Sequence, residues 1–181
     1  MARFLYSAAM SLDGFIAGPG GDMSWLADYF GPNPMVDELI PQVGALLVGG
    51  RTYGGDDPHR GREGEGKAFG GGWDGPQFVL TRRPQTTPEP GVTFLADLND
   101  AVDAAGRAAG EGYVNILGAN VAAQCLALAV LDEVLVSIVP MMLGDGTRLF
   151  ERPGGAGVRL EQISRSHTAT LTSLWFRVIR P

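Results

Sequence analysis

Residues 113–140, YVNILGANVAAQCLALAVLDEVLVSIVP, contain the pattern that decides the fold. Two short apolar runs, YVNILG and DEVLVSIVP, flank a segment rich in alanine and leucine, ANVAAQCLALAV. Short apolar runs favour buried strands, whereas the longer segment without glycine or proline favours a helix. A strand, a helix and a second strand in succession predict two parallel strands joined by a crossover helix.

The same alternation extends toward the N-terminus. Two further helices are predicted, over NPMVDELIPQVG and DLNDAVDAAGRAAGEG. Asn33 is a candidate N-cap of the first, with Pro34 at its first position and Gly44 closing it, and Asp97 is a candidate cap of the second. Short apolar runs predict strands within residues 3–11, 45–50, 77–81 and 92–95.

Two stretches differ from this alternation. VRLEQISRSHT and ATLTSLWFRVIRP near the C-terminus show partial alternation, which predicts an antiparallel ribbon with one face covered. Residues 54–75 hold nine glycines in 22 positions, so we expect a glycine-rich loop insertion over 54–76. The expected fold is one α/β domain over residues 1–181, with a mostly parallel mixed sheet and a C-terminal antiparallel ribbon.

The bulk properties argue against several classes of function. A net charge of −6 disfavours nucleic-acid binding, which needs a basic surface. The single cysteine, Cys125, permits no disulfide within the chain, and together with the two histidines, His59 and His167, it forms no metal-ligand pattern. No signal peptide and no apolar run of about 20 residues is recognisable, so we expect a cytoplasmic protein without membrane contact.

Five strand ends carry glycine or polar residues. These are SLDG, VGGRT, LTRR, LGAN and PMMLGDG. In open α/β sheets, ligands bind beyond the carboxyl ends of the strands. The convergence of five such ends at one edge of the sheet predicts a ligand site there.

Taken in order, the motifs resemble the dihydrofolate reductase-like family, especially the branch of the riboflavin-biosynthesis pyrimidine reductase, the C-terminal domain of a bifunctional deaminase-reductase. AAMSLDGFIAG is similar to the first strand and nicotinamide loop, VGGRTY to the Gly-Arg-x-Thr turn, and FVLTRR to the strand that meets the adenosine phosphate. ILGANVAAQCL resembles the turn and helix over the pyrophosphate, and DEVLVSIVPMMLGDGTRLF the strand and loop that follow. The resemblance implies a three-layer α/β/α fold, an NADPH-dependent oxidoreductase, and a homodimer.

The resemblance also implies roles for individual residues, and a small heterocyclic or ribityl-pyrimidine-type substrate. Substrate would lie beside Trp25, Asp28 and the PMMLGDG loop, which contains Gly144. The implied cofactor contacts are Ala9 and Ile16 at the nicotinamide, Gly49, Arg51 and Thr52 at a phosphate, Thr81 and Arg82 at the 2′-phosphate, and Gly118, Ala119 and Asn120 at the pyrophosphate.

Several of these residues also have a purely structural interpretation. Thr52 at a helix start either caps that helix or helps to bind an anion. Arg82 and Arg83 follow a buried strand and are either a solvated pair or the cations that an extra phosphate needs. The glycine-rich loop is either a lid with glycine hinges or a surface insertion.

The proton donor is the least defined part of the hypothesis. Asp28 is the main candidate, Asp22 and Glu38 are lesser ones, and each is otherwise a solvent-facing carboxylate. Two functions therefore stay open: a reductase, or a non-catalytic nucleotide-binding module of the same fold. The second is motivated by Gly50, which displaces the arginine of the turn by one position, and by Leu117, which stands where the family has a glycine.

Overall fold

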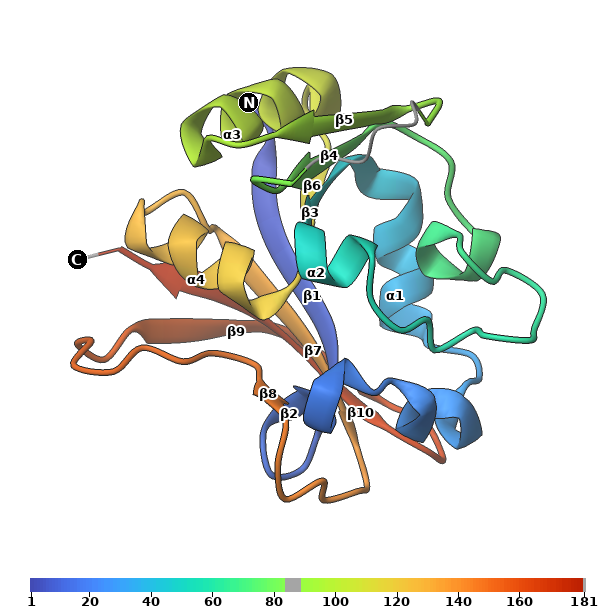
Figure 1. The fold of residues 1–181 in the computed structure, drawn as a ribbon. Coiled ribbons are helices and arrows are strands. Elements are labelled where there is room, and N and C mark those ends of the chain that lie inside the picture. The colour runs from blue at the N-terminus through green and yellow to red at the C-terminus, as the bar shows by residue number, and fades with distance from the viewer. Residues whose placement is uncertain (84–88, 181) are drawn as a thin grey trace.

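A single mixed sheet organises the chain in the computed structural model, which describes residues 1–83 and 89–180 (Figure 1). Its strand order is β5-β4-β3-β6-β1-β7-β10-β9, and the first six strands are parallel to one another. The strands are β1 (Arg3–Ser11), β3 (Val43–Gly49), β4 (Gln77–Leu80), β5 (Val92–Leu95), β6 (Tyr113–Leu117), β7 (Glu133–Val139), β9 (Arg159–His167) and β10 (Thr172–Ile179). The short strands β2 (Phe15–Ala17) and β8 (Thr147–Arg148) form a separate antiparallel pair.

Helices cover both faces of the sheet, which makes three layers. On one face α3 (Leu98–Ala109) and α4 (Ala119–Ala127) pack through buried residues such as Ala105 and Cys125. On the other face α1 (Pro34–Leu39) packs through Met35 and Leu39. The remaining helical segments are α2 (Gly50–Tyr53) and the 3-10 turns η1 (Pro19–Gly21), η2 (Ser24–Tyr29), η3 (Ile40–Gln42) and η4 (Ala68–Gly71). The predicted α/β architecture, with a mostly parallel sheet and C-terminal antiparallel strands, is confirmed.

The predicted helix caps are present. The Asn33 side chain accepts a hydrogen bond from the backbone N–H of Val36, and Pro34 is the first residue of α1. The Asp97 side chain likewise accepts hydrogen bonds from the backbone N–H groups of Asn99 and Asp100 in the first turn of α3. Both caps accept hydrogen bonds from first-turn N–H groups, which have no carbonyl partner within the helix.

The end of α1 differs from the prediction. The helix ends at Leu39, because η3 with its proline follows, and Gly44 lies inside β3 instead of closing the helix. A Cβ atom on Gly44 would lie 2.6 Å from the backbone oxygen of Ala109, at the end of α3. Gly44 therefore allows α3 to approach the sheet, a contact between segments far apart in the sequence. The helix predicted over residues 119–130 is also shorter, since α4 ends at Ala127.

The C-terminal ribbon is antiparallel, as predicted, but neither face of its outer strand, β9, is covered. β10 pairs with β7 on one side and β9 on the other, and a bulge between Trp175 and Phe176 interrupts the second pairing. Every residue of β9 except Ser166 is exposed, including Leu160 and Ile163. No helix within the described residues is both long and apolar enough to cross a membrane.

Candidate functional site

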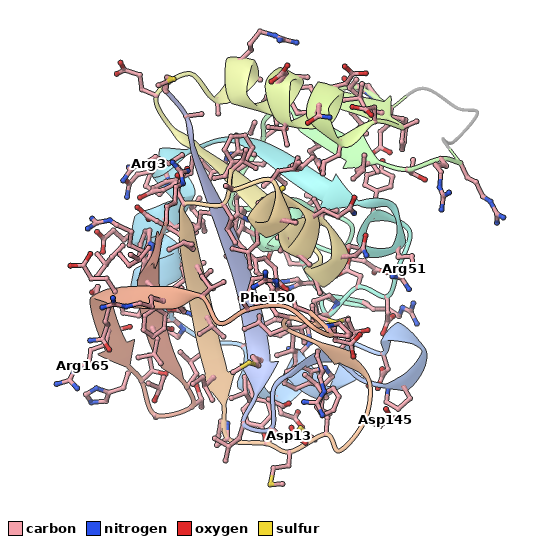
Figure 2. The ribbon with its side chains drawn as sticks, turned by 90° about the vertical axis from the view of Figure 1, so that its left-hand side faces the viewer. Arg3, Asp13, Arg51, Asp145, Phe150 and Arg165 are labelled. Atoms are coloured by element: carbon pink, nitrogen blue, oxygen red, sulfur yellow. The ribbon has the colours of Figure 1, made fainter. Side chains whose placement is uncertain are left out.

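A large cleft of about 2460 Å³ runs along the carboxyl ends of the parallel strands. In Figure 2, Arg51 lies on the right, Asp145 at the lower right and Asp13 at the bottom, while Arg3, at the start of β1, lies at the upper left. The cleft is lined by all ten residues predicted to contact a cofactor: Ala9, Ile16, Gly49, Arg51, Thr52, Thr81, Arg82, Gly118, Ala119 and Asn120. The structure therefore brings these residues together, while their roles stay predictions.

The ends of β3, β4 and β6 lie very close to one another. A Cβ atom on Gly118, whose φ is +112°, would lie 2.6 Å from Thr52 Oγ1. A Cβ atom on Gly50 would lie 2.8 Å from Thr81 Cβ. Glycine at both positions lets the Thr52 and Thr81 side chains pack against these strand ends, and Gly49, Gly50 and Gly118 form a glycine-lined floor of the cleft.

The N-terminus of α4 opens onto this floor. Its N-cap residue is Gly118, and no side chain caps it among the described residues. The first N–H groups of a nine-residue helix are thus available to an anion at the end where the helix dipole is positive. Asn120 belongs to this first turn, and its Oδ1 accepts a hydrogen bond of 2.7 Å from Gln124 Nε2.

Thr52 does not cap a helix. The N-cap of α2 is Gly49, and Thr52 is the third residue of this four-residue turn. Two further glycines, Gly54 and Gly55, follow, so the helix cannot continue. The Thr52 side chain instead lies between the ends of β3 and β6, next to Gly118.

Cations gather at the same end of the cleft. Arg51 follows β3, whereas Arg82 and Arg83 follow β4, and all three are exposed and line the cleft. The Thr81 hydroxyl accepts a hydrogen bond of 3.1 Å from the backbone N–H of Arg83, which orders the start of this turn. Guanidinium groups here can bind a phosphate without first breaking an ion pair within the described residues.

The other end of the cleft is bordered by the turn after β1. Asp13 accepts hydrogen bonds from the Ser11 hydroxyl at 2.6 Å and from the backbone N–H groups of Leu143 and Gly144 at 3.1 and 2.7 Å. The Ser11 hydrogen bond, followed by those backbone donors, lowers the pKa of Asp13 to about 2. The Asp13 carboxylate thus fastens the 141–146 loop to the turn that leads to Ile16.

Three residues predicted at the substrate side do not line the cleft. Trp25 is buried in a small apolar cluster with Leu26 and Val139. Asp28 is exposed on η2 and is absent from the cleft lining, so the geometry does not support it as a proton donor. Gly144 is engaged with Asp13, and its neighbours Asp145 and Gly146 line the cleft instead.

The lesser acid candidates fare similarly. Asp22 and Glu38 are absent from the lining, and the Asp22 side chain accepts a hydrogen bond from the backbone N–H of Ser24. The hydroxyl and backbone N–H of Ser24 lower the pKa of Asp22. Neither residue therefore replaces Asp28 as a proton donor.

A closed ring of hydrogen bonds that the sequence did not reveal lies at the cleft wall. Asn33 Nδ2 donates to Ser137 Oγ at 3.0 Å, and Ser173 Oγ donates to Asn33 Oδ1 at 3.3 Å. The hydroxyls of Ser137 and Ser173 are 2.8 Å apart. Asn33 was recognisable only as a cap, because the serines come from β7 and β10. Asp37, one turn further along α1, also lines the cleft.

The glycine-rich loop forms the outer wall. Asp56 accepts a hydrogen bond from the backbone N–H of Met23 and pairs with Arg60 at 2.6 Å. The His59 ring stacks on Phe30 with their centroids 4.3 Å apart. The loop is thus packed against the segment that contains η2, and both segments line the cleft. Among the described residues, no group of three or more His, Cys, Asp or Glu side chains could hold a metal ion.

Comparisons with known proteins agree with this architecture. A putative riboflavin biosynthesis protein from Shewanella sp. PV-4 superposes with a TM-score of 0.73 at 24% identity, over 99% of this chain and 100% of that one. A deaminase/5-amino-6-(5-phosphoribosylamino)uracil reductase from Thermotoga maritima superposes with a TM-score of 0.69 at 18% identity, and 98% of this chain covers 57% of that protein. Dihydrofolate reductase from Enterococcus faecalis, complexed with NADP(H), gives 0.64 at 14% identity over 97% of this chain and 96% of that one.

The comparison with a family model assigns the family, which the low sequence identities to the individual structures do not. No curated protein sequence matches the chain. The model of the RibD C-terminal domain family, however, matches residues 4–172, nearly the whole chain. The chain therefore belongs to the RibD C-terminal domain family, the riboflavin-biosynthesis reductase branch of the dihydrofolate reductase-like fold.

Proposed function

We propose that the chain is an NADPH-dependent reductase that acts on a small heterocyclic or ribityl-pyrimidine-type substrate. The observation that carries this proposal is the cleft itself: a glycine-lined floor with three arginines at one end, continuous with an apolar border at Ala9 and Ile16. A cleft that is cationic at one end and apolar at the other matches a dinucleotide, whose phosphates need cations and whose reactive ring needs an apolar wall that excludes water. Family membership supports the same conclusion.

The residues of the cleft fit this cofactor. Gly118 lets Thr52 pack against the end of β6, and the uncapped start of α4 would bind the pyrophosphate through its N–H groups. Arg82 would bind the 2′-phosphate. A bound nicotinamide supplies the reducing equivalent, and the side chains of Ala9 and Ile16 would orient its ring and exclude water.

Binding of the two dinucleotides tests the cofactor. Tryptophan fluorescence titrations of the wild-type chain should show tighter binding of NADPH than of NADH. Arg82→Ala should weaken NADPH binding about tenfold or more and leave NADH binding nearly unchanged, because only NADPH carries the 2′-phosphate. Arg107→Ala, an exposed arginine of α3 outside the cleft, is the matched control. Equal losses for both cofactors in Arg82→Ala would refute the assignment.

A second function is favoured by one observation. Asp28, the main candidate for a proton donor, lies outside the cleft, as a non-catalytic nucleotide-binding module of the same fold would allow. Loss of nicotinamide absorbance in the presence of folates, pyrimidine ribosides and simple imines separates the two functions. Tight NADPH binding without turnover of any of these compounds would favour the module.

We also propose that two copies of the chain associate through the C-terminal ribbon. β9 is an edge strand whose residues are nearly all exposed, and Leu160 and Ile163 present apolar side chains there. An apolar groove of about 250 Å³ adjoins it, between α4 and the ribbon. A second copy offers an identical edge with which it can pair about a two-fold axis. Ile163→Lys should shift a dimer to monomers in analytical ultracentrifugation; a wild-type monomer at micromolar concentration would contradict the proposal.

A further inference from the structure

A row of side chains crosses the sheet at the position proposed for the nicotinamide ring. Ala9 of β1 pairs with Ser137 of β7, and Ser137 pairs with Ser173 of β10, three neighbouring strands of the sheet (Figure 1). Residues paired across neighbouring strands project from the same face, and such strands lie about 4.8 Å apart. The Ser137 hydroxyl is therefore one strand away from Ala9, which would contact the nicotinamide ring.

Asn33 joins this row from the start of α1. Its Nδ2 donates a hydrogen bond of 3.0 Å to Ser137 Oγ, and its Oδ1 accepts one of 3.3 Å from Ser173 Oγ. Both serines are buried, and buried hydroxyl groups need hydrogen-bond partners. The two serines thus hold the Asn33 amide at the cleft wall, where Asn33 and Ser137 belong to the lining.

The orientation of the Asn33 amide follows from its role as the cap of α1. Oδ1 accepts a hydrogen bond from the backbone N–H of Val36 as well as from Ser173. Exchanging the amide oxygen and nitrogen would place one N–H group against another and would lose the cap. Nδ2 therefore faces Ser137, and its second N–H has no acceptor among the described residues. The wall offers an uncharged donor to a ligand that lies beside the nicotinamide.

We propose that Asn33 recognises the ring of the substrate by donating this N–H to a carbonyl oxygen that projects from the heterocycle. Ser137 and Ser173 position the amide. Because a donor at this place favours a carbonyl group over an amino group, the site prefers a pyrimidinedione to a pyrimidine with amino groups at the same positions. The inference rests on the proposed function and deepens it, since it assigns the residue that distinguishes these two classes of substrate.

Two uncharged compounds test the donor. Two ring carbonyls of 5,6-diaminouracil are replaced by amino groups in 2,4,5,6-tetraaminopyrimidine. Each compound is titrated by NMR against the chain saturated with NADPH, at a mildly alkaline pH that keeps both uncharged, so that the charged side chains around the cleft act alike on both. Diaminouracil should bind about tenfold more tightly, because an amino group would meet the Asn33 N–H with a second donor. Equal binding, tighter binding of the tetraamino compound, or binding of neither would overturn the proposal.

Asn33→Asp converts the donor into an acceptor and keeps the cap. Aspartate is a good N-cap, and its carboxylate can accept from both serine hydroxyls, so the thermal unfolding midpoint should stay close to that of the wild-type chain. The preference should reverse, with the tetraamino compound bound more tightly. Asn99→Asp, the same substitution on α3 outside the cleft, should retain the wild-type preference. An unchanged preference in Asn33→Asp would exclude Asn33 from recognition.

Ser173 is tested as a positioning residue, since it is fully buried and does not line the cleft. Ser173→Ala removes one of the two donors to Asn33 Oδ1, so the preference for diaminouracil should fall severalfold. A loss of stability alone does not change the ratio of the two dissociation constants. A lower unfolding midpoint with an unchanged ratio would contradict the positioning role.

The proposed cofactor can fail separately. If NADPH does not bind, the same two compounds are titrated against the chain alone. The preference for diaminouracil and its reversal in Asn33→Asp are expected there as well, because the hydrogen bonds of Asn33 involve only Val36 and the two serines. Their absence would refute this proposal, whereas a failure of NADPH binding alone would refute the reductase.

Discussion

Replacing Gly118 with alanine should cost the chain both stability and cofactor affinity. With φ at +112° and ψ at 127°, Gly118 has a backbone conformation that residues with a side chain rarely adopt, which corresponds to a penalty of about 1–3 kcal/mol. The new Cβ would also lie 2.6 Å from Thr52 Oγ1, and overpacking of this kind costs about 1–3 kcal/mol more. The free energy of unfolding should therefore fall by about 2–6 kcal/mol.

Urea unfolding followed by circular dichroism measures this loss, and two variants divide it into its causes. Gly154→Ala is the control for the backbone conformation alone, because Gly154 has φ +73° with nothing within 4 Å of an added Cβ. Its free energy of unfolding should fall by only about 1–2 kcal/mol. Adding Thr52→Ala to Gly118→Ala removes the hydroxyl from the contact and should restore the overpacking part.

Two results would contradict this packing: Gly118→Ala loses no more unfolding free energy than Gly154→Ala, or Thr52→Ala restores none of the loss. The first result would mean that the Cβ position of Gly118 is not crowded. The second would mean that the Thr52 side chain is not what fills the space. NADPH binding by Gly118→Ala should also weaken, because the added methyl group pushes Thr52 away from Gly118 and so distorts the glycine-lined floor of the cleft. Fluorescence titration at a temperature below the unfolding transition measures this.

Three further predictions concern stability. The pKa of Asp13 in the folded chain is about 2, below its ordinary value of 3.8, so its stabilising effect is complete above pH 3.8 and is lost as the pH falls toward 2. Asp13→Asn should therefore reduce the dependence of the unfolding free energy on pH between 3.8 and 2. An unchanged pH profile would contradict this. Glu133→Ala leaves the buried donors of Tyr113 and Trp175 unpaired and should lower the unfolding free energy by about 2–5 kcal/mol in guanidinium titrations; a loss below about 1 kcal/mol would count against the network. Gly44→Ala should lower it by about 1–3 kcal/mol while NADPH affinity is unchanged, because Gly44 is outside the cleft.

Local sequence signals were sufficient for much of the fold. The strand–helix–strand unit over residues 113–140 and the caps at Asn33 and Asp97 depend on apolar runs and on side chains that reach only a few residues. Gly44 could not be assigned in the same way. Its requirement comes from the backbone of Ala109, and a single sequence contains no record of which distant segment approaches a glycine.

The same distinction applies to the site. The cofactor residues follow parallel strands, and such strands must end at the same edge of the sheet, so their convergence was predictable. Asp28 depended on the direction of one side chain on a 3-10 turn, which the sequence does not define. The hydrogen-bond ring joins Asn33 to serines 104 and 140 residues away. No short-range pattern could have connected them.

The departure of the turn after β3 from the family pattern has a structural cause. A side chain at position 50 would begin 2.8 Å from Thr81 Cβ and 3.3 Å from the backbone oxygen of Leu80, and would force the ends of β3 and β4 apart. Those ends carry Arg51 and Arg82, so separating them would also separate the two cations. Glycine at position 50 thus keeps the strand ends together, and the arginine displaced to position 51 still lines the cleft. The extra glycine is consequently explained by the packing of these strand ends, and it does not count against the proposed phosphate site.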